Sequence, residues 1–216
     1  MMKHLKRFDD SIESICKKYG ITNYSINIDG SIDVDSDVNL SEKKLTKLPL
    51  KFNKVGGYFN CSYNQLNTLE GSPREVGGHF YCYSNQLTTL EGSPREVGGD
   101  FNCYSNQLTT LEGSPREVGG DFNCSYNQLT TLEGSPREVG GNFNCSYNQL
   151  TTLEGSPMEV GGNFYCNNNK LPQVIMRSKY LKKILTQGDD FYIWKRGKLD
   201  MSSFEYMIEI FEDEDI

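Results

Sequence analysis

The chain of 216 residues is long enough for one or two globular domains, yet only 36 % of its residues are apolar. A typical globular domain has roughly 45–50 % apolar residues, so a single compact core is not expected. A repeat protein, in contrast, buries a thin continuous core with fewer apolar residues. The formal net charge of −7 disfavours binding to a nucleic-acid backbone, which needs a basic surface. No segment is apolar over the ~18–20 residues that span a membrane.

Residues 1–44 are predicted to form a cap at the N-terminal end of a repeat array. Residues 4–19 place apolar side chains on one helical face, and Gly20 is typical of a helix end. Asp29-Gly30, between alternating apolar residues, predicts a β-hairpin. Residues 24–44 also match the repeat that follows, which indicates a degenerate coil. The apolar positions of this coil are Val34, Val38 and Leu40.

Internal repetition dominates residues 45–170. The 21-residue segment that begins at Leu66 recurs four times, starting at Leu87, Leu108, Leu129 and Leu150. A less regular copy occupies residues 45–65. We therefore predict six stacked repeats of 21 residues. The alternation Phe80-Tyr81-Cys82 indicates a strand with one apolar face in each repeat.

Residues that lie 21 positions apart are expected to stack in columns, about 4.8 Å from coil to coil. One inward column contains Phe59, Phe80, Phe101, Phe122, Phe143 and Phe164. The next contains Cys61, Cys82, Cys103, Cys124, Cys145 and Cys166, and columns of Leu and Val complete the core. Asn85 and its equivalents are expected to bind backbone groups of adjacent coils. The remainder of each repeat, with its Glu and Arg columns, is expected to be exposed extended chain and turns.

The repeat Gly-Gly-x-Phe-x-Cys-x-x-Asn-x-Leu-x-x-Leu resembles the leucine-rich-repeat pattern Leu-x-x-Leu-x-Leu-x-x-Asn-x-Leu. The run from Pro73 to Val76 is similar to short-repeat bacterial leucine-rich-repeat effectors, although Gly77-Gly78 adds one residue. The chain is also similar to Gly-Gly-x-Phe-x-Cys repeat proteins of large DNA phages and other viruses. This resemblance implies a mainly β, leucine-rich-repeat-like solenoid with a parallel strand ladder. It implies little about function, because this scaffold serves many partners.

Residues 171–216 are predicted to cap the other end of the solenoid. The apolar spacing indicates a helix over 173–187 and a short hairpin over 191–199. A second helix is predicted to begin with a capping box formed by Ser202 and Glu205. The segment is too short for the ligase domain that some bacterial leucine-rich-repeat effectors carry.

The cysteine column is the most obvious candidate for a metal or disulfide site. A column of small buried thiols is better explained by packing, because no histidine column accompanies it and a linear array does not give tetrahedral ligation. Cys16 is expected in the core of the N-terminal helix. His4 and His79 lie in no recognisable catalytic motif, and no phosphate-binding loop is present. We therefore predict no enzymatic activity, no cofactor and no metal.

The outward strand positions vary from repeat to repeat although the core positions hardly change. Tyrosine, asparagine and serine predominate there, a composition typical of recognition surfaces. We therefore predict that the concave strand face binds a protein partner. The predicted binding residues are Tyr58, His79, Tyr81, Tyr83, Asp100, Asn102, Tyr104, Asp121, Asn123 and Tyr165.

The sequence thus favours a protein-interaction module that binds neither nucleic acid nor membrane. The odd number of seven cysteines and the lack of a secretory apolar run favour a reducing cytoplasm, that of a host cell if the protein is viral. Two alternatives remain open. The chain could be a structural component of a larger assembly, such as a viral particle, that contacts its neighbours through the caps. It could also have a catalytic role in the region around Trp194 and Lys195.

Overall fold

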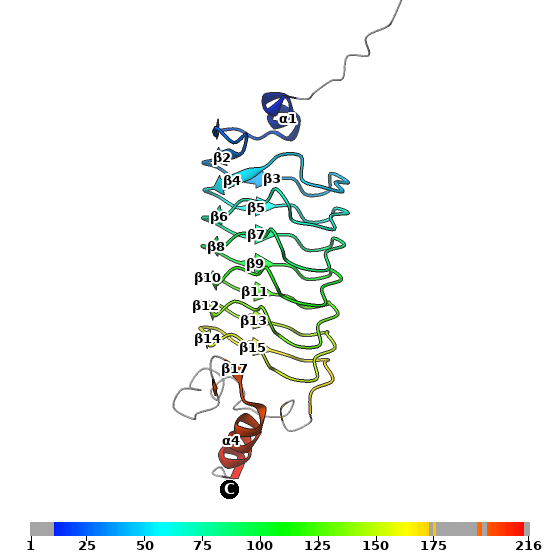
Figure 1. The fold of residues 1–216 in the computed structure, drawn as a ribbon, viewed down its shortest axis with the longest axis vertical. Coiled ribbons are helices and arrows are strands. Elements are labelled where there is room, and N and C mark those ends of the chain that lie inside the picture. Colours follow the sequence, from blue (N-terminus) through cyan, green and yellow to red (C-terminus); the bar gives the residue numbers. More distant parts are fainter. Residues whose placement is uncertain (1–10, 173–174, 176–193, 196–197, 214–216) are drawn as a thin grey trace, which may run out of the picture.

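The computed structural model describes residues 11–172, 175, 194–195 and 198–213. Within this part of the chain, the polypeptide winds into a β-solenoid in which each turn, here called a coil, adds one short strand to each of two sheets (Figure 1). In the view of Figure 1 the coils stack in a nearly straight column. Helix α1 (Ile12–Tyr19) lies at one end of the column and helix α4 (Met201–Asp213) at the other. The predicted repeat solenoid with a parallel strand ladder is confirmed.

The first sheet contains the strands that were predicted from the Phe-x-Cys alternation. Its seven strands follow the order β15-β13-β11-β9-β7-β5-β3 and are parallel. They are β3 (Val38–Asn39), β5 (Phe59–Asn60), β7 (Phe80–Tyr81), β9 (Phe101–Asn102), β11 (Phe122–Asn123), β13 (Phe143–Asn144) and β15 (Phe164–Tyr165). Residues 21 apart lie opposite each other, as Phe80 and Phe101 do. Val38 lies opposite Phe59, so the degenerate coil has the register that the sequence predicted.

The second sheet was predicted only in the hairpin around Asp29-Gly30. Its eight strands follow the order β1-β2-β4-β6-β8-β10-β12-β14 and are parallel from β2 onward. They are β1 (Tyr24–Ile26), β2 (Ile32–Val34), β4 (Phe52–Val55), β6 (Glu75–Val76), β8 (Glu96–Val97), β10 (Glu117–Val118), β12 (Glu138–Val139) and β14 (Glu159–Val160). The sequence indicated only extended chain here, because a two-residue strand shows no measurable alternation. These short strands pair because the coils stack. Each inner two-residue strand lies in register with the equivalent strands of the preceding and the following coil.

The core columns have the phase that the sequence predicted. Phenylalanine, cysteine, both leucine columns and valine are buried in all the central coils. The phenylalanine rings of successive central coils are nearly parallel, with centroids 5.2–5.5 Å apart from Phe59 to Phe143. Only in the last coil is this position half-buried, at Phe164. The core is therefore one continuous strip that runs the length of the stack.

The asparagine column links neighbouring coils, as predicted. The side-chain nitrogen of Asn85 donates to the carbonyl oxygens of Cys61, in the preceding coil, and Cys82, at 3.0 and 3.1 Å. Its side-chain oxygen accepts the backbone N–H of Leu66 at 2.9 Å. The same arrangement recurs from Asn64 to Asn169. These bonds satisfy backbone groups at the bend after each strand, where no sheet partner is available.

The Gly-Gly pair allows the coils to approach backbone to backbone. A Cβ atom on Gly119 would overlap the carbonyl oxygen of Gly98 in the preceding coil, and the equivalent glycine of every other regular coil has the same close neighbour. Gly113 has a further reason to be glycine, because its φ of +89° lies in the left-handed region. The spacing between coils therefore depends on the absence of side chains at these positions.

The N-terminal cap joins the stack through a hairpin. Helix α1 begins after Ser11, whose hydroxyl accepts the N–H of Ser14, and ends at Gly20 with φ +68°. Its one fully buried side chain is Cys16. Strand β1 pairs antiparallel with β2, as predicted. Ile28, which belongs to the alternating apolar pattern, is fully exposed in the turn between the two strands.

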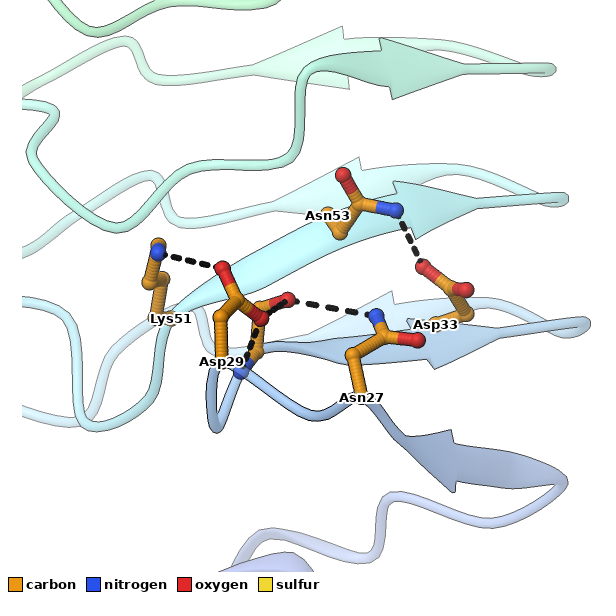
Figure 2. A network of polar contacts seen from close by, with 6 residues as sticks. Asn27, Asp29, Asp33, Lys51 and Asn53 are labelled. Atoms are coloured by element: carbon orange, nitrogen blue, oxygen red, sulfur yellow. Dashed lines mark hydrogen bonds and ion pairs between the residues drawn. The ribbon is translucent and has the colours of Figure 1, made fainter.

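Polar contacts connect this hairpin to the coil formed by residues 45–65 (Figure 2). The carboxylate of Asp29 lies 2.7 Å from the ammonium of Lys51 and accepts the N–H and hydroxyl of Ser31 at 3.1 and 2.6 Å. The hydrogen bond from Lys51, followed by those from Ser31, lowers the pKa of Asp29 well below its usual range. Asn53 donates to Asp33 at 2.7 Å across the same junction.

The described part of the C-terminal segment differs from the prediction in one respect. Strands β16 (Trp194–Lys195) and β17 (Lys198–Leu199) pair antiparallel inside the predicted hairpin. Helix α4, however, begins at Met201, so Ser202 lies inside its first turn instead of capping it. Asp200 occupies the N-cap position instead. Its carbonyl accepts the N–H of Phe204 at 3.0 Å, and its carboxylate accepts the hydroxyl of Ser203 at 2.8 Å.

Parts of the predicted caps are left untested. Residues 4–10 of the first predicted helix, and all of the helix over 173–187 except Ile175, lie outside the described residues. The division of the chain after residues 44 and 170 stays a prediction.

A central core ring should matter far more to stability than an exposed side chain in the same coil. Phe122 is fully buried between the rings of its neighbours. We expect Phe122→Ala to lower the free energy of unfolding by about 3–5 kcal/mol, measured by denaturant titration. Arg116→Ala is the matched control. The Arg116 side chain is largely exposed, and its ion pair with Glu117 is long, at 3.9 Å, so the substitution should lower the free energy of unfolding by less than about 0.5 kcal/mol. Equal losses in the two variants would contradict the packing described above.

Candidate functional site

The predicted binding residues lie on the outer side of the seven-stranded sheet and in the turns that border it. This surface is described as concave in the sequence analysis. The stack is nearly straight in the view of Figure 1, so we call the surface simply the strand face. His79 and Tyr165 are exposed, and the other eight predicted residues are half-buried. Three serines that were expected to point outward are instead buried, because the chain turns inward directly after each cysteine. These serines are Ser62, Ser125 and Ser146.

Three of the predicted binding residues also hold the stack together. The carboxylate of Asp121 accepts the backbone N–H of Asn142 in the next coil at 2.7 Å. Asp100 accepts the N–H of Asp121 in the same way at 2.9 Å, and Nδ1 of His79 accepts the N–H of Asp100 at 2.9 Å. From His79 to Asn142 this position therefore supplies an acceptor that reaches the next coil, whereas the preceding coil has Tyr58 there.

Asn102 and Asn123 close the turn that follows their strands. Each side-chain oxygen accepts the backbone N–H two residues further on, that of Tyr104 at 3.3 Å and that of Ser125 at 3.1 Å. Asn123 also accepts the hydroxyl of Ser125 at 2.7 Å. These asparagines have a local structural role that any coil of this shape would use.

Tyrosine replaces this turn-closing asparagine in two coils, at Tyr81 and Tyr165. A phenol cannot close the turn, so both coils give up a bond that the others keep. The ring of Tyr81 instead stacks on His79, with centroids 5.5 Å apart and planes 8° apart, and meets the edge of Tyr83. Burial, followed by the negative charge of Asp100 and the neighbouring Tyr83, raises the pKa of Tyr81. Tyr81 thus has aromatic contacts in place of the turn-closing hydrogen bond.

Three exposed tyrosines were not among the predicted binding residues. Each lies at the position of the turn where the backbone has the left-handed conformation. Their φ values are 54–57° and their exposed fractions are 46–53 %. Bulky side chains rarely adopt this conformation, and asparagine does so more readily, as Asn168 does in the last coil. A signal was available in the sequence, because three coils have Cys-Ser-Tyr-Asn where two others have Cys-Tyr-Ser-Asn. The three residues are Tyr63, Tyr126 and Tyr147.

Together these residues form an aromatic surface that we call the tyrosine strip. It consists of Tyr63, Tyr81, Tyr83, Tyr104, Tyr126, Tyr147 and Tyr165. The ring of Tyr83 lies 4.7 Å from Tyr104 in a parallel stack and 5.2 Å from Tyr63 edge to face. Further along, Tyr126 and Tyr147 stack at 4.2 Å. The tyrosines therefore extend from the first repeat, at Tyr63, to the last, at Tyr165.

The tyrosine strip presents ring edges and phenol groups more than open ring faces. Rings that stack from coil to coil cover each other's faces. Sugars and nucleobases bind to open aromatic faces, whereas protein interfaces use tyrosine edges and hydroxyl groups as well. A shallow pocket of about 230 Å³ adjoins the strip in the last coils. Its lining consists of Ser125, Tyr126, Asn144, Ser146, Tyr147, Tyr165 and Asn167.

A larger groove, of about 640 Å³, runs along the eight-stranded sheet. Its floor is the exposed glycine column, and one wall is the column of glutamates from Glu75 to Glu159. Four of these five glutamates follow an arginine in their own coil, with Arg137 3.7 Å from Glu138, and Lys54 of the preceding coil lies 3.2 Å from Glu75. The groove follows from the glycines that the stacking requires, and its neutral border selects no charged ligand.

The cysteine column has the properties of core packing. All seven cysteines of the chain are free and buried. Burial raises the pKa of each column thiol, that of Cys61 to about 12 and that of Cys166 to about 11. A thiol that stays protonated is a poor nucleophile and a poor metal ligand. Among the described residues, no three histidine, cysteine or acidic side chains are grouped so that they could hold a metal ion.

Comparisons with protein-family models, with characterised proteins and with solved structures found no match to this chain. In the described ranges, no helix has the length and apolar character needed to cross a membrane. The geometry and chemistry of the strand face therefore provide the basis for a functional proposal.

The burial of the cysteines can be tested by thiol labelling. At pH 8 the column thiols remain protonated and shielded, so we expect iodoacetamide to modify few of them in the folded protein and all of them in denaturant. Intact-mass spectrometry counts the modified thiols. Rapid labelling of most of the column in the folded state would contradict the inward placement of these side chains.

Replacement of Tyr81 by the asparagine of the other coils should hardly affect stability. The substitution gives up stacking on His79, worth about 0.5–1.5 kcal/mol, and restores a turn-closing hydrogen bond of similar value. We therefore expect Tyr81→Asn to change the free energy of unfolding by less than about 1 kcal/mol. Asn123→Ala only removes the turn-closing bonds, so it should destabilise the protein by about 1 kcal/mol. A loss in Tyr81→Asn as large as that of a core substitution would mean that the tyrosine is structural.

Proposed function

We propose that the protein is a non-catalytic interaction module of the leucine-rich-repeat type that binds a protein partner on the strand face, chiefly through the tyrosine strip. One observation carries this proposal: tyrosine occupies positions at which the backbone favours asparagine. At Tyr81 and Tyr165 it displaces a turn-closing side chain, and at Tyr63, Tyr126 and Tyr147 it adopts a left-handed conformation. Local strain kept at surface positions is typical of functional sites.

Stacking between the tyrosines does not account for their placement. The phenylalanine column shows the form of a structural aromatic ladder, with the same residue at the same position in each coil. The tyrosines instead shift between neighbouring positions from coil to coil, from Tyr104 to Tyr126 for example. Tyrosine brings a large contact area with little loss of conformational entropy, which makes it frequent at the centres of protein interfaces.

A reducing cytoplasm is the compartment we propose, that of a host cell if the similarity to phage and viral repeat proteins holds. A column of free cysteines at coil-to-coil spacing supports a reducing environment.

A structural component that assembles through its caps is the second candidate. The exposed isoleucines of the N-terminal hairpin support it, since Ile26 is 44 % exposed and Ile28 fully exposed. In that case, the purified protein should form defined higher-order species on a sizing column without any partner. Those species should disappear when both isoleucines are replaced by threonine.

The interaction module can be tested by site-specific crosslinking. A photoreactive phenylalanine analogue at position 81 should crosslink a distinct protein in a lysate of the native cells, identified by mass spectrometry. The same analogue at the exposed position Thr109, which lies outside the strand face, should not.

Substitutions from sister coils provide the variant that should lose the partner. We expect Tyr63→Ser with Tyr104→Ser to abolish capture of the crosslinked protein, because both rings leave the strip, while the melting transition changes by only a few degrees. Gln86→Ala with Thr109→Ala, two exposed side chains away from the strip, is the matched control and should capture it normally. If the tyrosine variant captured the partner as well as the wild type does, the strand face would not be the binding site.

A further inference from the structure

The strand face has a charge of one sign. Its outward positions and the adjacent turn residues from 58 to 168 contain no lysine and no arginine. They do contain Asp100 and Asp121, in neighbouring coils beside the tyrosines, and Asp37 precedes them in the same column. The face over the eight-stranded sheet differs, because Lys54 and four arginines lie among its glutamates there.

The negative charge is not needed for stacking. The carboxylates of Asp100 and Asp121 each accept a backbone N–H of the next coil, at 2.9 and 2.7 Å. Asn142 does the same with its amide oxygen at 2.7 Å, to the N–H of Asn163. An uncharged side chain therefore performs the backbone capping equally well. The Asp121 carboxylate also accepts the side-chain amide of Asn142 at 3.1 and 3.2 Å, whereas the capping gives no reason for the charge at Asp100.

Local electrostatics makes this charge unfavourable in the isolated protein. Like charges in directly opposite positions of adjacent strands repel each other, and the two carboxylates belong to coils about 4.8 Å apart. Nδ1 of His79 accepts the N–H of Asp100 at 2.9 Å and lies 3.1 Å from the second carboxylate oxygen of Asp100. A cation between Asp100 and Asp121 would relieve the repulsion between the two carboxylates.

The aromatic groups around the carboxylates favour one kind of cation. Asp100 is close enough to Tyr81 to affect its titration, Tyr81 meets the edge of Tyr83, and Tyr83 stacks on Tyr104. Carboxylate oxygens, phenol oxygens and aromatic rings are the three groups that a guanidinium binds, through its planar fork of donors and its weakly hydrated faces. A strongly hydrated ammonium uses the rings less well, and a phosphate or carboxylate ligand would be repelled.

We propose that the partner presents an arginine-bearing, positively charged protein segment, which lies across His79, Tyr81, Tyr83 and Tyr104 with a guanidinium bridging Asp100 and Asp121. This inference rests on the proposed function and adds the chemistry of the partner. Two acceptors one coil apart are within reach of a single guanidinium, and charge complementarity of this kind speeds association and excludes partners of the wrong charge.

The experiment measures binding of a fluorescent peptide of alternating arginine and serine by anisotropy. The reference peptide carries citrulline, which has the shape of arginine without its charge. We expect the arginine peptide alone to bind, and Asp100→Asn with Asp121→Asn to weaken it by about tenfold or more. The variant should remain folded, because asparagine caps this column in the later coils. Asp100→Asn alone should weaken binding in the same direction and serves if the double variant unfolds.

Glu96→Gln with Glu117→Gln is the matched control, since it removes the same number of charges from the opposite sheet and should leave affinity within about twofold. Equal binding of the citrulline peptide, no binding of the arginine peptide, or unchanged affinity in the aspartate variants would overturn the inference. The crosslinking experiment at position 81 separates this outcome from failure of the proposed function. A partner that is crosslinked there, and lost in the tyrosine variant, leaves the binding module intact even if the arginine peptide does not bind.

Discussion

Direct backbone contact between successive coils is the constraint on which the rest of the structure depends. Gly98 and Gly119 approach so closely that no side chain fits between them, and this fixes the distance at which every other column stacks. At that distance the phenylalanine rings lie in parallel contact and Asn85 reaches the carbonyl groups of two coils. Two-residue strands form for the same reason, because each is held in register from both sides.

The same constraint reduces the freedom of the surface. On the strand face, one column supplies an acceptor for the next coil in most coils and another closes the following turn, and an asparagine side chain is sufficient for both. Residues that obey these requirements carry no functional information. Those that depart from them do, and the departures are tyrosines at turn positions and charges where an amide is sufficient. A functional surface on a repeat scaffold is thus recognised as a set of exceptions to the repeat.

The two long faces of the solenoid illustrate this difference. The groove over the eight-stranded sheet is the larger hollow, yet each of its features follows from stacking: glycines for close approach and glutamates beside cations. The strand face has only a small pocket, but it combines aromatic edges with negative charge that no lysine or arginine of this face balances. The proposal of a binding surface there therefore depends on chemistry and not on volume, in keeping with protein interfaces, which are flatter than ligand pockets.

The period, the inward columns and the linking role of Asn85 could all be predicted from the sequence. The reason is that the same residue recurs at the same position of successive repeats, and these positions stack in register. The sequence did not determine the sheet that contains Glu75 and Val76, since two residues give no alternation. Nor did it show that Ser125 is buried while Tyr126, the next residue, is exposed with a positive φ. The direction of a side chain in a turn depends on the backbone dihedrals there, and these are decided only when neighbouring coils pack together.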